Sequence, residues 1–404
     1  MIFFSLNAAG GSASVFLSLA NALQENGHEV DVYTYYWNQK DCFPELTKKL
    51  NIRSIKKISS KDTILNNNSI LARLLLGKDY YVNAQKLYKL LKGSNYQVIY
   101  SSEALAYIPA LIYKKHKNVP VVWYVADPIS LADNKREGSL IEKYGWFKKI
   151  LQIHNFFDQK KIRSIDRVIV PTHKMKKQLD SFYGINCLVF PTTGVRIDEF
   201  KVNLKKLAEE RLRLKFSFIR KNETILLSIG HFLPHRRYED SLTALVQIVK
   251  KNPNVKFIIS GSDRFDPQYF NLIKTLVKKL SLEQYVILDT EFKSNNEIIG
   301  YYQFSDIFLF VCVEQTWGLA PFEAMACHKP VVISKGVGAK EVLAFPRTII
   351  VEEKSPTQIV DAVTRLIEEK QYYQKVAQTG YLFVKKNFDY HSVAENLVSK
   401  LKKI

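Results

Sequence analysis

A segment near residue 320 combines groups that bind sugars and phosphates with an otherwise apolar run, EQTWGLAPFEAM. Pro321 suits the first turn of a helix, because the N–H that it lacks would have no partner there. The backbone amides of Gly318, Leu319 and Ala320 then point out of a helix N-terminus and could bind a phosphate. Glu323, one turn into the helix, could accept hydrogen bonds from a vicinal diol such as a ribose. It could equally serve only to complement the helix dipole.

A second group of polar residues follows an apolar run at 224–229 and reads GHFLPHRRYED. It places His231, Arg236 and Arg237 directly before a predicted helix. A guanidinium group binds a diphosphate in a bidentate manner and stabilises it as a leaving group. Either arginine alone could be an ordinary surface charge. The pair indicates a site for a phosphorylated ligand.

Two loops in the first half of the chain also follow predicted strands. Gly10 and Gly11 lie between the first strand and the first helix, where glycine lets the backbone approach a ligand, although a Gly-Gly pair is more often only a turn. Asp127 follows another strand, in the loop VADP. In open parallel sheets, ligands bind at the carboxyl ends of the strands, so these loops are candidates for the site.

The elements that position these loops alternate between short apolar runs and helical patterns. This alternation predicts βαβ units in doubly wound parallel sheets. The predicted strands are 2–6, 30–35, 98–100, 119–125, 167–171 and 188–190, followed by 224–229, 255–260, 285–288, 307–312, 330–334 and 348–351. A charged helical stretch near 202–221 separates the two series, so we predict two α/β domains joined near 191–222. The chain ends in two amphipathic helices, broken around 387–390.

Composition limits the class of protein. The chain has 404 residues, 47% of them apolar and 24% charged, which fits a globular protein of two domains. Its four cysteines form no CxxC pair, which argues against a disulfide framework or a structural zinc and favours a reducing compartment. The apolar runs are shorter than the roughly 20 residues that a membrane span needs. The first residues, MIFFSL, resemble a strand more than a secretion signal, so we expect a cytoplasmic protein.

The net charge of +20 is concentrated in Lys48–Lys92. That stretch contains eleven basic residues: Lys48, Lys49, Arg53, Lys56, Lys57, Lys61, Arg73, Lys78, Lys86, Lys89 and Lys92. Such a cluster attracts phosphate in a nucleic acid, in anionic lipid headgroups or in a pyrophosphate-linked substrate. A solvated basic surface without a partner would show the same composition.

Several segments together resemble the retaining glycosyltransferases of family 4, which have the GT-B fold. The resemblance covers nearly the whole chain. It is carried by GGSASVFLSLANALQENGHEVDVYT (10–34), DRVIVPTHKMKKQL (166–179), VFPTTGVRIDEF (189–200), GHFLPHRRYED (230–240), FSDIFLFV (304–311) and WGLAPFEAMACHKPVV (317–332). It implies an α/β protein of two Rossmann-like domains facing a cleft. Residues 1–195 would form the acceptor-side domain, with a C-terminal helix at about 388–404 packing back on it, and 196–387 the donor-binding domain.

The resemblance also implies roles for matching positions. Glu323 corresponds to the glutamate that holds the donor's ribose, and Arg236 to the cation that neutralises the donor diphosphate. Gly318 and Leu319 would supply amides to the phosphates or the donor sugar. Phe292 lies where the backbone contacts the base. Further donor-site positions are Ala320, Arg237, Gly261, Gly10 and Gly11.

Three positions depart from the family pattern. Gln315 stands at the first glutamate of the family's E-x7-E signature, and it can bond a sugar hydroxyl but offers no negative charge. His231 replaces the usual arginine of the phosphate loop, which could introduce a pH dependence near neutrality. Asp127 is the nearest polar candidate in the loop where the family often presents a histidine.

Together with these residues, the resemblance implies an enzyme that moves a sugar from a UDP-, GDP- or ADP-sugar to a hydroxyl with retention of configuration. Arginine and a helix N-terminus would replace a divalent metal. A lipid-linked or cell-surface glycan would be the acceptor, with the basic stretch at an anionic membrane surface. Another GT-B activity, such as that of a nucleotide-sugar epimerase, is the alternative. A basic nucleic-acid-binding protein fits less well, because no stacking platform of interleaved aromatic and basic residues is evident.

Overall fold

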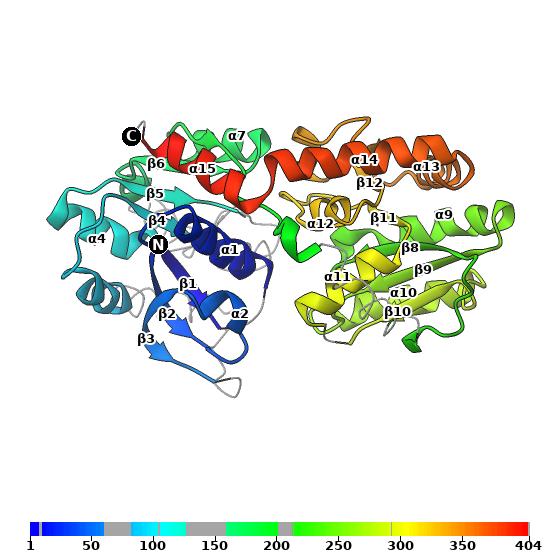
Figure 1. Cartoon of the computed structure of the whole chain (residues 1–404), viewed down its shortest axis with the longest axis horizontal. Helices are drawn as coiled ribbons and strands as arrows, with labels where there is room; N and C mark the ends of the chain where they lie inside the picture. The colour runs from blue at the N-terminus through cyan, green and yellow to red at the C-terminus, as the bar shows by residue number, and fades with distance from the viewer. Residues whose placement is uncertain are drawn as a thin grey trace, which may run out of the picture. The chain divides into compact units, whose positions relative to one another are not determined.

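The computed structural model describes residues 1–7, 10–59, 82–103, 106–126, 159–200, 212, 214–291 and 293–402. The chain divides into two compact units (Figure 1). The first consists of Met1–Thr193 with Val393–Ile404, and the second of Gly194–Ser392. Each unit is an α/β layer structure with its own parallel sheet. Within the described residues, no helix is long and apolar enough to cross a lipid bilayer.

The first unit contains a seven-stranded sheet in the order β3-β2-β1-β4-β5-β6-β7. Its strands are β1 (Ile2–Leu6), β2 (Asp31–Trp37), β3 (Asn51–Lys57), β4 (Ile99–Ser102), β5 (Val121–Tyr124), β6 (Arg167–Val170) and β7 (Leu188–Val189). Its helices include α1 (Gly11–Glu25), α2 (Pro44–Thr47), α4 (Tyr107–Lys117), α7 (His173–Tyr183) and most of α15 (Tyr390–Leu401). Consecutive residues of β1 serve opposite faces. Ile2 joins the core that contains α4 and α7, whereas Phe3 packs on Phe16 of α1 at 4.7 Å between ring centroids.

The second unit contains a six-stranded sheet in the order β10-β9-β8-β11-β12-β13. Its strands are β8 (Thr224–Ile229), β9 (Val255–Ser260), β10 (Val286–Asp289), β11 (Ile307–Phe310), β12 (Val331–Ser334) and β13 (Ile349–Val351). The helices are α9 (Tyr238–Lys251), α10 (Pro267–Lys279), α11 (Asn295–Phe304), α12 (Ala320–Ala326), α13 (Pro356–Glu368) and α14 (Lys370–Asn387), with short 3₁₀ turns η1 (Ile197–Phe200), η2 (Pro234–Arg236) and η3 (Gly338–Glu341).

Two hydrophobic cores enclose the second sheet, one on each face. Leu226 of β8 packs with α9, α10 and α13, and the next residue, Leu227, packs with α11, α12 and α14. Strands buried on both faces read as continuous apolar runs, which is why the sequence pattern located them. The predicted doubly wound parallel sheets are confirmed. The predicted break between the last two helices is also observed, between α14 and α15.

Strand β3 was not among the predicted strands, because its sequence NIRSIKK lies inside the basic stretch. It pairs in parallel with β2 along six residue positions and forms one edge of the first sheet. Arg53, Lys56 and Lys57 on this strand are exposed. Charged side chains on an edge strand discourage pairing with another chain. The basic composition is therefore compatible with a strand at this position.

Candidate active site

The order of strands places two of the predicted loops next to each other. β8 and β11 are neighbours at the centre of the second sheet, and the strand order reverses between them. At such a switch point, the loops that follow the two strands separate and leave room for a ligand. The loop after β8 carries His231 and Arg236, and the loop after β11 leads to Gln315 and Glu323. A backbone bond from Val313 N–H to the carbonyl of His235, 2.8 Å long, joins the two loops.

Arg236 ends the 3₁₀ turn η2 and is partly buried. Its guanidinium carbon lies 5.0 Å from the ring centroid of Phe310, and Nη1 lies 3.6 Å from Sγ of Cys312. The guanidinium also fills the space beside Gly230, where an added Cβ would lie 3.0 Å from it. Among the described residues, no carboxylate forms an ion pair with Arg236. This cation is held in place by apolar and sulfur contacts, and no carboxylate that the structure describes neutralises its charge.

Arg237, the next residue, has a different environment. It lies before the first turn of α9 with φ of 52° and forms ion pairs with Glu239 at 2.5 Å and Asp240 at 2.8 Å. The bonds to Asp240, followed by the charge of Glu239, raise the pKa of the guanidinium despite partial desolvation. Two carboxylates of its own helix thus neutralise Arg237. The predicted role of Arg237 in donor binding remains a prediction, and these ion pairs give it a structural role as well.

His231 lies at the start of the loop after β8, with its ring centroid 4.4 Å from that of Phe265. Desolvation lowers the pKa of the imidazole, and the positive charge of Arg236 lowers it further. Both effects favour the neutral ring over the imidazolium. Phosphate binding by this loop would therefore depend mainly on Arg236.

Glu323 lies on α12 and is partly buried. The hydroxyl of Tyr302, on α11, donates a 2.6 Å hydrogen bond to its Oε2. Burial raises the pKa of this carboxyl, and the bond from Tyr302 opposes the shift without cancelling it. The carboxylate is thus oriented by a tyrosine from another helix. This contact gives Glu323 a fixed position that helix-dipole compensation alone would not require.

The loop that precedes α12 is fixed by its backbone. Gln315 N–H donates to the carbonyl of Gly336 at 3.0 Å, and the Gln315 carbonyl accepts from Gly338 N–H at 2.8 Å. Gly318 has φ of 96°, and an added Cβ would lie 2.8 Å from Phe310, so the loop requires glycine here. Of the other predicted phosphate-binding positions, Leu319 directly precedes α12 and Ala320 begins it. The sequence prediction that a helix follows this segment, with Pro321 in its first turn, is borne out.

Gly261 follows β9 and has a packing role. A Cβ at this position would lie 1.9 Å from the carbonyl oxygen of Gly230, so the backbone after β9 touches the backbone after β8. Close approach of these two backbone segments is sufficient to explain the glycine, so a ligand is not needed to account for it. The predicted contact of Gly261 with a nucleotide remains a prediction.

Two family models match the chain and together extend over most of it. The model described as "Glycosyltransferase Family 4" matches residues 9–192, and that described as "Glycosyl transferases group 1" matches residues 210–383. The chain belongs to the family 4 glycosyltransferases. The predicted family, the GT-B fold and the transferase class of this enzyme are thereby confirmed.

Relatives of this glycosyltransferase are distant in sequence. An uncharacterized glycosyltransferase of Methanocaldococcus jannaschii is 21% identical, covering 97% of this chain and 94% of the relative. An alpha-1,3/1,6-mannosyltransferase of Yarrowia lipolytica is 23% identical, covering 88% of this chain and 82% of the relative. Among solved structures, the Anabaena protein HepE in complex with UDP and glucose has a TM-score of 0.72 at 17% identity, covering 100% of this chain and 99% of that one. This last similarity concerns the fold.

The remaining predicted site residues of this glycosyltransferase are not part of the loops after β8 and β11. Gly10 and Gly11 belong to the first unit, where Gly10 precedes α1 and Gly11 begins it. An added Cβ at either position would meet nothing within 4 Å, so internal packing does not require glycine at either. Asp127 and Phe292 lie outside the described residues.

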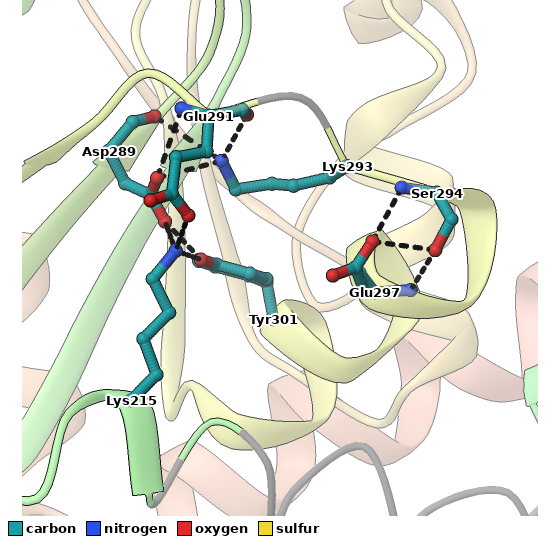
Figure 2. Close-up of polar contacts among 7 residues, drawn as sticks. All are labelled: Lys215, Asp289, Glu291, Lys293, Ser294, Glu297 and Tyr301. Carbon is teal, nitrogen blue, oxygen red and sulfur yellow. Dashed lines mark hydrogen bonds and ion pairs between the residues drawn. The ribbon is translucent and has the colours of Figure 1, made fainter.

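A cluster of charged residues at the end of β10 was missed by the sequence analysis (Figure 2). Asp289 is buried and accepts hydrogen bonds from Lys215 at 2.9 Å, from Lys293 at 2.9 Å and from the hydroxyl of Tyr301. Lys215 also pairs with Glu291 at 2.6 Å. Burial alone would raise the pKa of Asp289, but the bonds from Tyr301 and the two lysines outweigh it, and the pKa lies below its usual value.

This Asp289 cluster fixes the start of α11. The ammonium group of Lys293 also donates to the carbonyl of Glu291 at 2.6 Å, which closes the loop after β10. The next residue, Ser294, forms a capping box with Glu297, as Figure 2 shows. A signal for the cap was present in the sequence, since Ser and Glu three residues apart are typical of a helix start. No local signal indicated that Asp289 and Lys215, 74 residues apart, would meet.

Proposed function

We propose that this glycosyltransferase moves a sugar from a nucleoside diphosphate to a hydroxyl group of an acceptor, with retention of the anomeric configuration. The bond between the anomeric carbon and the diphosphate oxygen breaks, and the diphosphate leaves with the electron pair. The acceptor oxygen forms the new glycosidic bond, and its proton passes to the departing diphosphate. Membership of family 4 supports glycosyl transfer. The similarity to HepE, whose structure contains UDP and glucose, supports a nucleotide donor.

The observation that carries the proposal is the guanidinium of Arg236 at the switch point of the second sheet. It is ordered by Phe310 and Cys312, and no carboxylate of the described residues neutralises it. A fixed cation of this kind stabilises negative charge that develops on a leaving diphosphate, with little reorganisation during the reaction. We propose that Arg236 fulfils this function without a divalent cation and that Gln315 and the amides near Gly318 contact the donor.

Glu323 completes the proposed donor site. Its carboxyl group, held by Tyr302, would accept hydrogen bonds from the two ribose hydroxyls of the donor. These contacts form in the ground state as well as in the transition state, so they should contribute mainly to donor affinity. Loss of Glu323 is therefore expected to raise KM more than it lowers kcat.

A donor screen tests the proposal. Purified protein is incubated with UDP-, GDP- and ADP-sugars, and thermal shift and release of the nucleoside diphosphate are measured with and without acceptor glycans. We expect stabilisation by nucleotides with one preferred base, diphosphate release that depends on an acceptor, and activity in the presence of EDTA. Release without an acceptor would indicate hydrolysis or epimerisation. NMR of the product's anomeric configuration tests retention, and an inverted product would refute it.

The acceptor side of the proposal rests on the first unit. We define the basic edge as Lys48, Lys49, Arg53, Lys56 and Lys57, which are all exposed. We propose that it binds the anionic headgroups or phosphates around a lipid-linked acceptor at the inner face of the membrane, at about 1 kcal/mol per well-placed lysine.

Flotation with liposomes tests whether the basic edge binds anionic lipids. Protein should float with anionic vesicles and remain at the bottom with neutral ones, and the double variant Lys56→Glu, Lys57→Glu should weaken flotation. Exclusive recovery in the unbound fraction would favour a soluble acceptor.

A further inference from the structure

A small cavity lies between the sheet of the second unit and the first turn of α9. Its volume is about 10 Å³, close to that needed by one water molecule. Its lining includes residues of β8 and β11, and the polar side chains that matter here are those of Ser228, Arg236, Tyr238 and Ser241. Cavities of this size remain dry when their walls are apolar and hold water when polar atoms converge on them.

Two polar atoms of residues that line this cavity are buried and have no hydrogen-bond partner in the part of the chain that the structure describes. They are Nε of Arg236 and Oγ of Ser241, and the Ser241 side chain belongs to a residue that is only 2% exposed. A buried N–H of a charged group and a buried hydroxyl are each costly to leave unpaired. Two unpaired atoms on one water-sized cavity indicate a common partner that satisfies both.

The surrounding groups can complete the bonding of such a partner. The Tyr238 hydroxyl donates its hydrogen to the Gly230 carbonyl at 2.7 Å, and the Ser228 hydroxyl donates to the Leu309 carbonyl at 2.7 Å. Both oxygens keep lone pairs and can accept a further hydrogen bond. A water at this place would accept from Arg236 and have hydroxyl oxygens within the same wall to which it can donate. Buried waters typically make about three such bonds.

We propose that one water molecule occupies this cavity, bridges Nε of Arg236 to Oγ of Ser241, and makes Ser241 a positioning residue for the arginine. The inference rests on the proposed function of Arg236 at the donor diphosphate. Phe310 supports one face of the guanidinium, and Cys312 lies beside Nη1. The water fixes the Nε edge, which sets the direction in which the remaining N–H groups point. Bidentate binding of a diphosphate depends on that direction.

Kinetics of Ser241→Ala test the positioning role. We expect kcat to fall about tenfold, as when a buried hydrogen bond to a charged group is lost, with a smaller change in the donor KM. Ser241→Thr keeps the hydroxyl and should restore most of the activity. Thr364→Val is the matched control, because Thr364 on α13 also has a buried hydroxyl without a partner but does not line the cavity.

The control separates positioning from folding. If Ser241→Ala and Thr364→Val lower the Tm similarly and only Ser241→Ala lowers kcat, the proposal is supported. If both variants keep the wild-type kcat, Ser241 does not position Arg236. The variant Arg236→Ala distinguishes this failure from a failure of the proposed function. If Arg236→Ala is nearly inactive and Ser241→Ala is fully active, only the positioning role is refuted. If Arg236→Ala is active, the function of the arginine itself is refuted.

A crystal structure of the wild-type protein at high resolution tests the water directly, including the case in which Ser241→Ala does not fold. We expect a single density peak within hydrogen-bonding distance of Nε of Arg236 and Oγ of Ser241. An empty cavity, or a rotamer of Arg236 that pairs Nε with another group, would overturn the proposal.

Discussion

Two regions at the ends of the second sheet's strands hold their charges in opposite ways. At the end of β10, Asp289 is bonded to two lysines and a tyrosine, and its pKa lies below the usual value. In the loops after β8 and β11, Arg236 has no carboxylate partner among the described residues, and burial raises the pKa of Glu323. The first arrangement satisfies its charges internally and stabilises a loop. The second leaves the guanidinium of Arg236 without a carboxylate partner among the described residues, as a binding site for an anionic ligand would.

The variant Asp289→Asn should show the largest effect and should affect stability. It leaves Lys293, whose side chain is only 8% exposed, as a buried cation without a carboxylate. Breaking a buried pair in this way typically costs about 3–5 kcal/mol of unfolding free energy. Urea unfolding measures this loss, while kcat measured well below the Tm should remain close to wild type. A large fall in kcat with unchanged stability would mean that the Asp289 cluster belongs to the active site.

The variant Arg236→Ala should show the reverse pattern. We expect kcat/KM to fall by roughly 100- to 1,000-fold, the range observed when one preorganised charge-stabilising group is removed. The Tm should change little, because no ion pair of Arg236 with a described residue is lost. Arg236→Lys keeps the charge without the bidentate geometry and should be intermediate. Retention of activity in Arg236→Ala would remove the distinction between the Asp289 cluster and the surroundings of Arg236.

The pH dependence of stability should have opposite signs at the two carboxyl groups. The folded-state pKa of Asp289 lies below its ordinary value of 3.8, so its contribution is complete above that pH and is lost as the pH falls through the folded-state pKa. The folded-state pKa of Glu323 lies above 4.5, so its contribution is complete below that pH and is lost as the pH rises through the folded-state pKa.

Unfolding free energies measured across this pH range test both signs. Glu323→Gln removes the pH dependence that Glu323 contributes. The unfolding free energy of the variant should therefore increase relative to that of the wild type as the pH rises above 4.5. The variant should also raise the donor KM. A difference that does not change with pH would show that Glu323 is ionised at its ordinary pKa.

The smallest effect is expected for Glu291→Gln. Its side chain is 74% exposed and pairs with Lys215, which keeps its bond to Asp289. An exposed pair of this kind contributes about 0–1 kcal/mol. The variant therefore controls for charge changes in the Asp289 cluster. A loss as large as that of Asp289→Asn would mean that the exposed part of the cluster, and not the buried pair, stabilises the loop.

Much of the fold could be predicted because strands of a covered parallel sheet are buried on both faces and read as apolar runs. The strands at 2–6, 224–229 and 255–260 match the structure residue for residue. Strand β3 was missed because an edge strand can carry charged side chains, and these obscure the alternation of apolar and polar residues that is typical of a strand. The candidate site could be predicted only in part. Arg236 and Arg237 are adjacent and of the same type, and nothing in the sequence indicated that Glu239 and Asp240 would neutralise only the second.

The sequence by itself determined the family, the alternation of strands and helices, and the segments after strands that contain Arg236 and Glu323. These properties depend on local patterns and short motifs, which are readable along the chain. Only the tertiary structure decided which charges are free and which are paired. Tyr302 meets Glu323 across 21 residues, Lys215 meets Asp289 across 74, and Phe310 and Cys312 frame Arg236 from a neighbouring strand and its loop. Electrostatic interactions depend on distance and burial in space, and sequence separation carries no information about either.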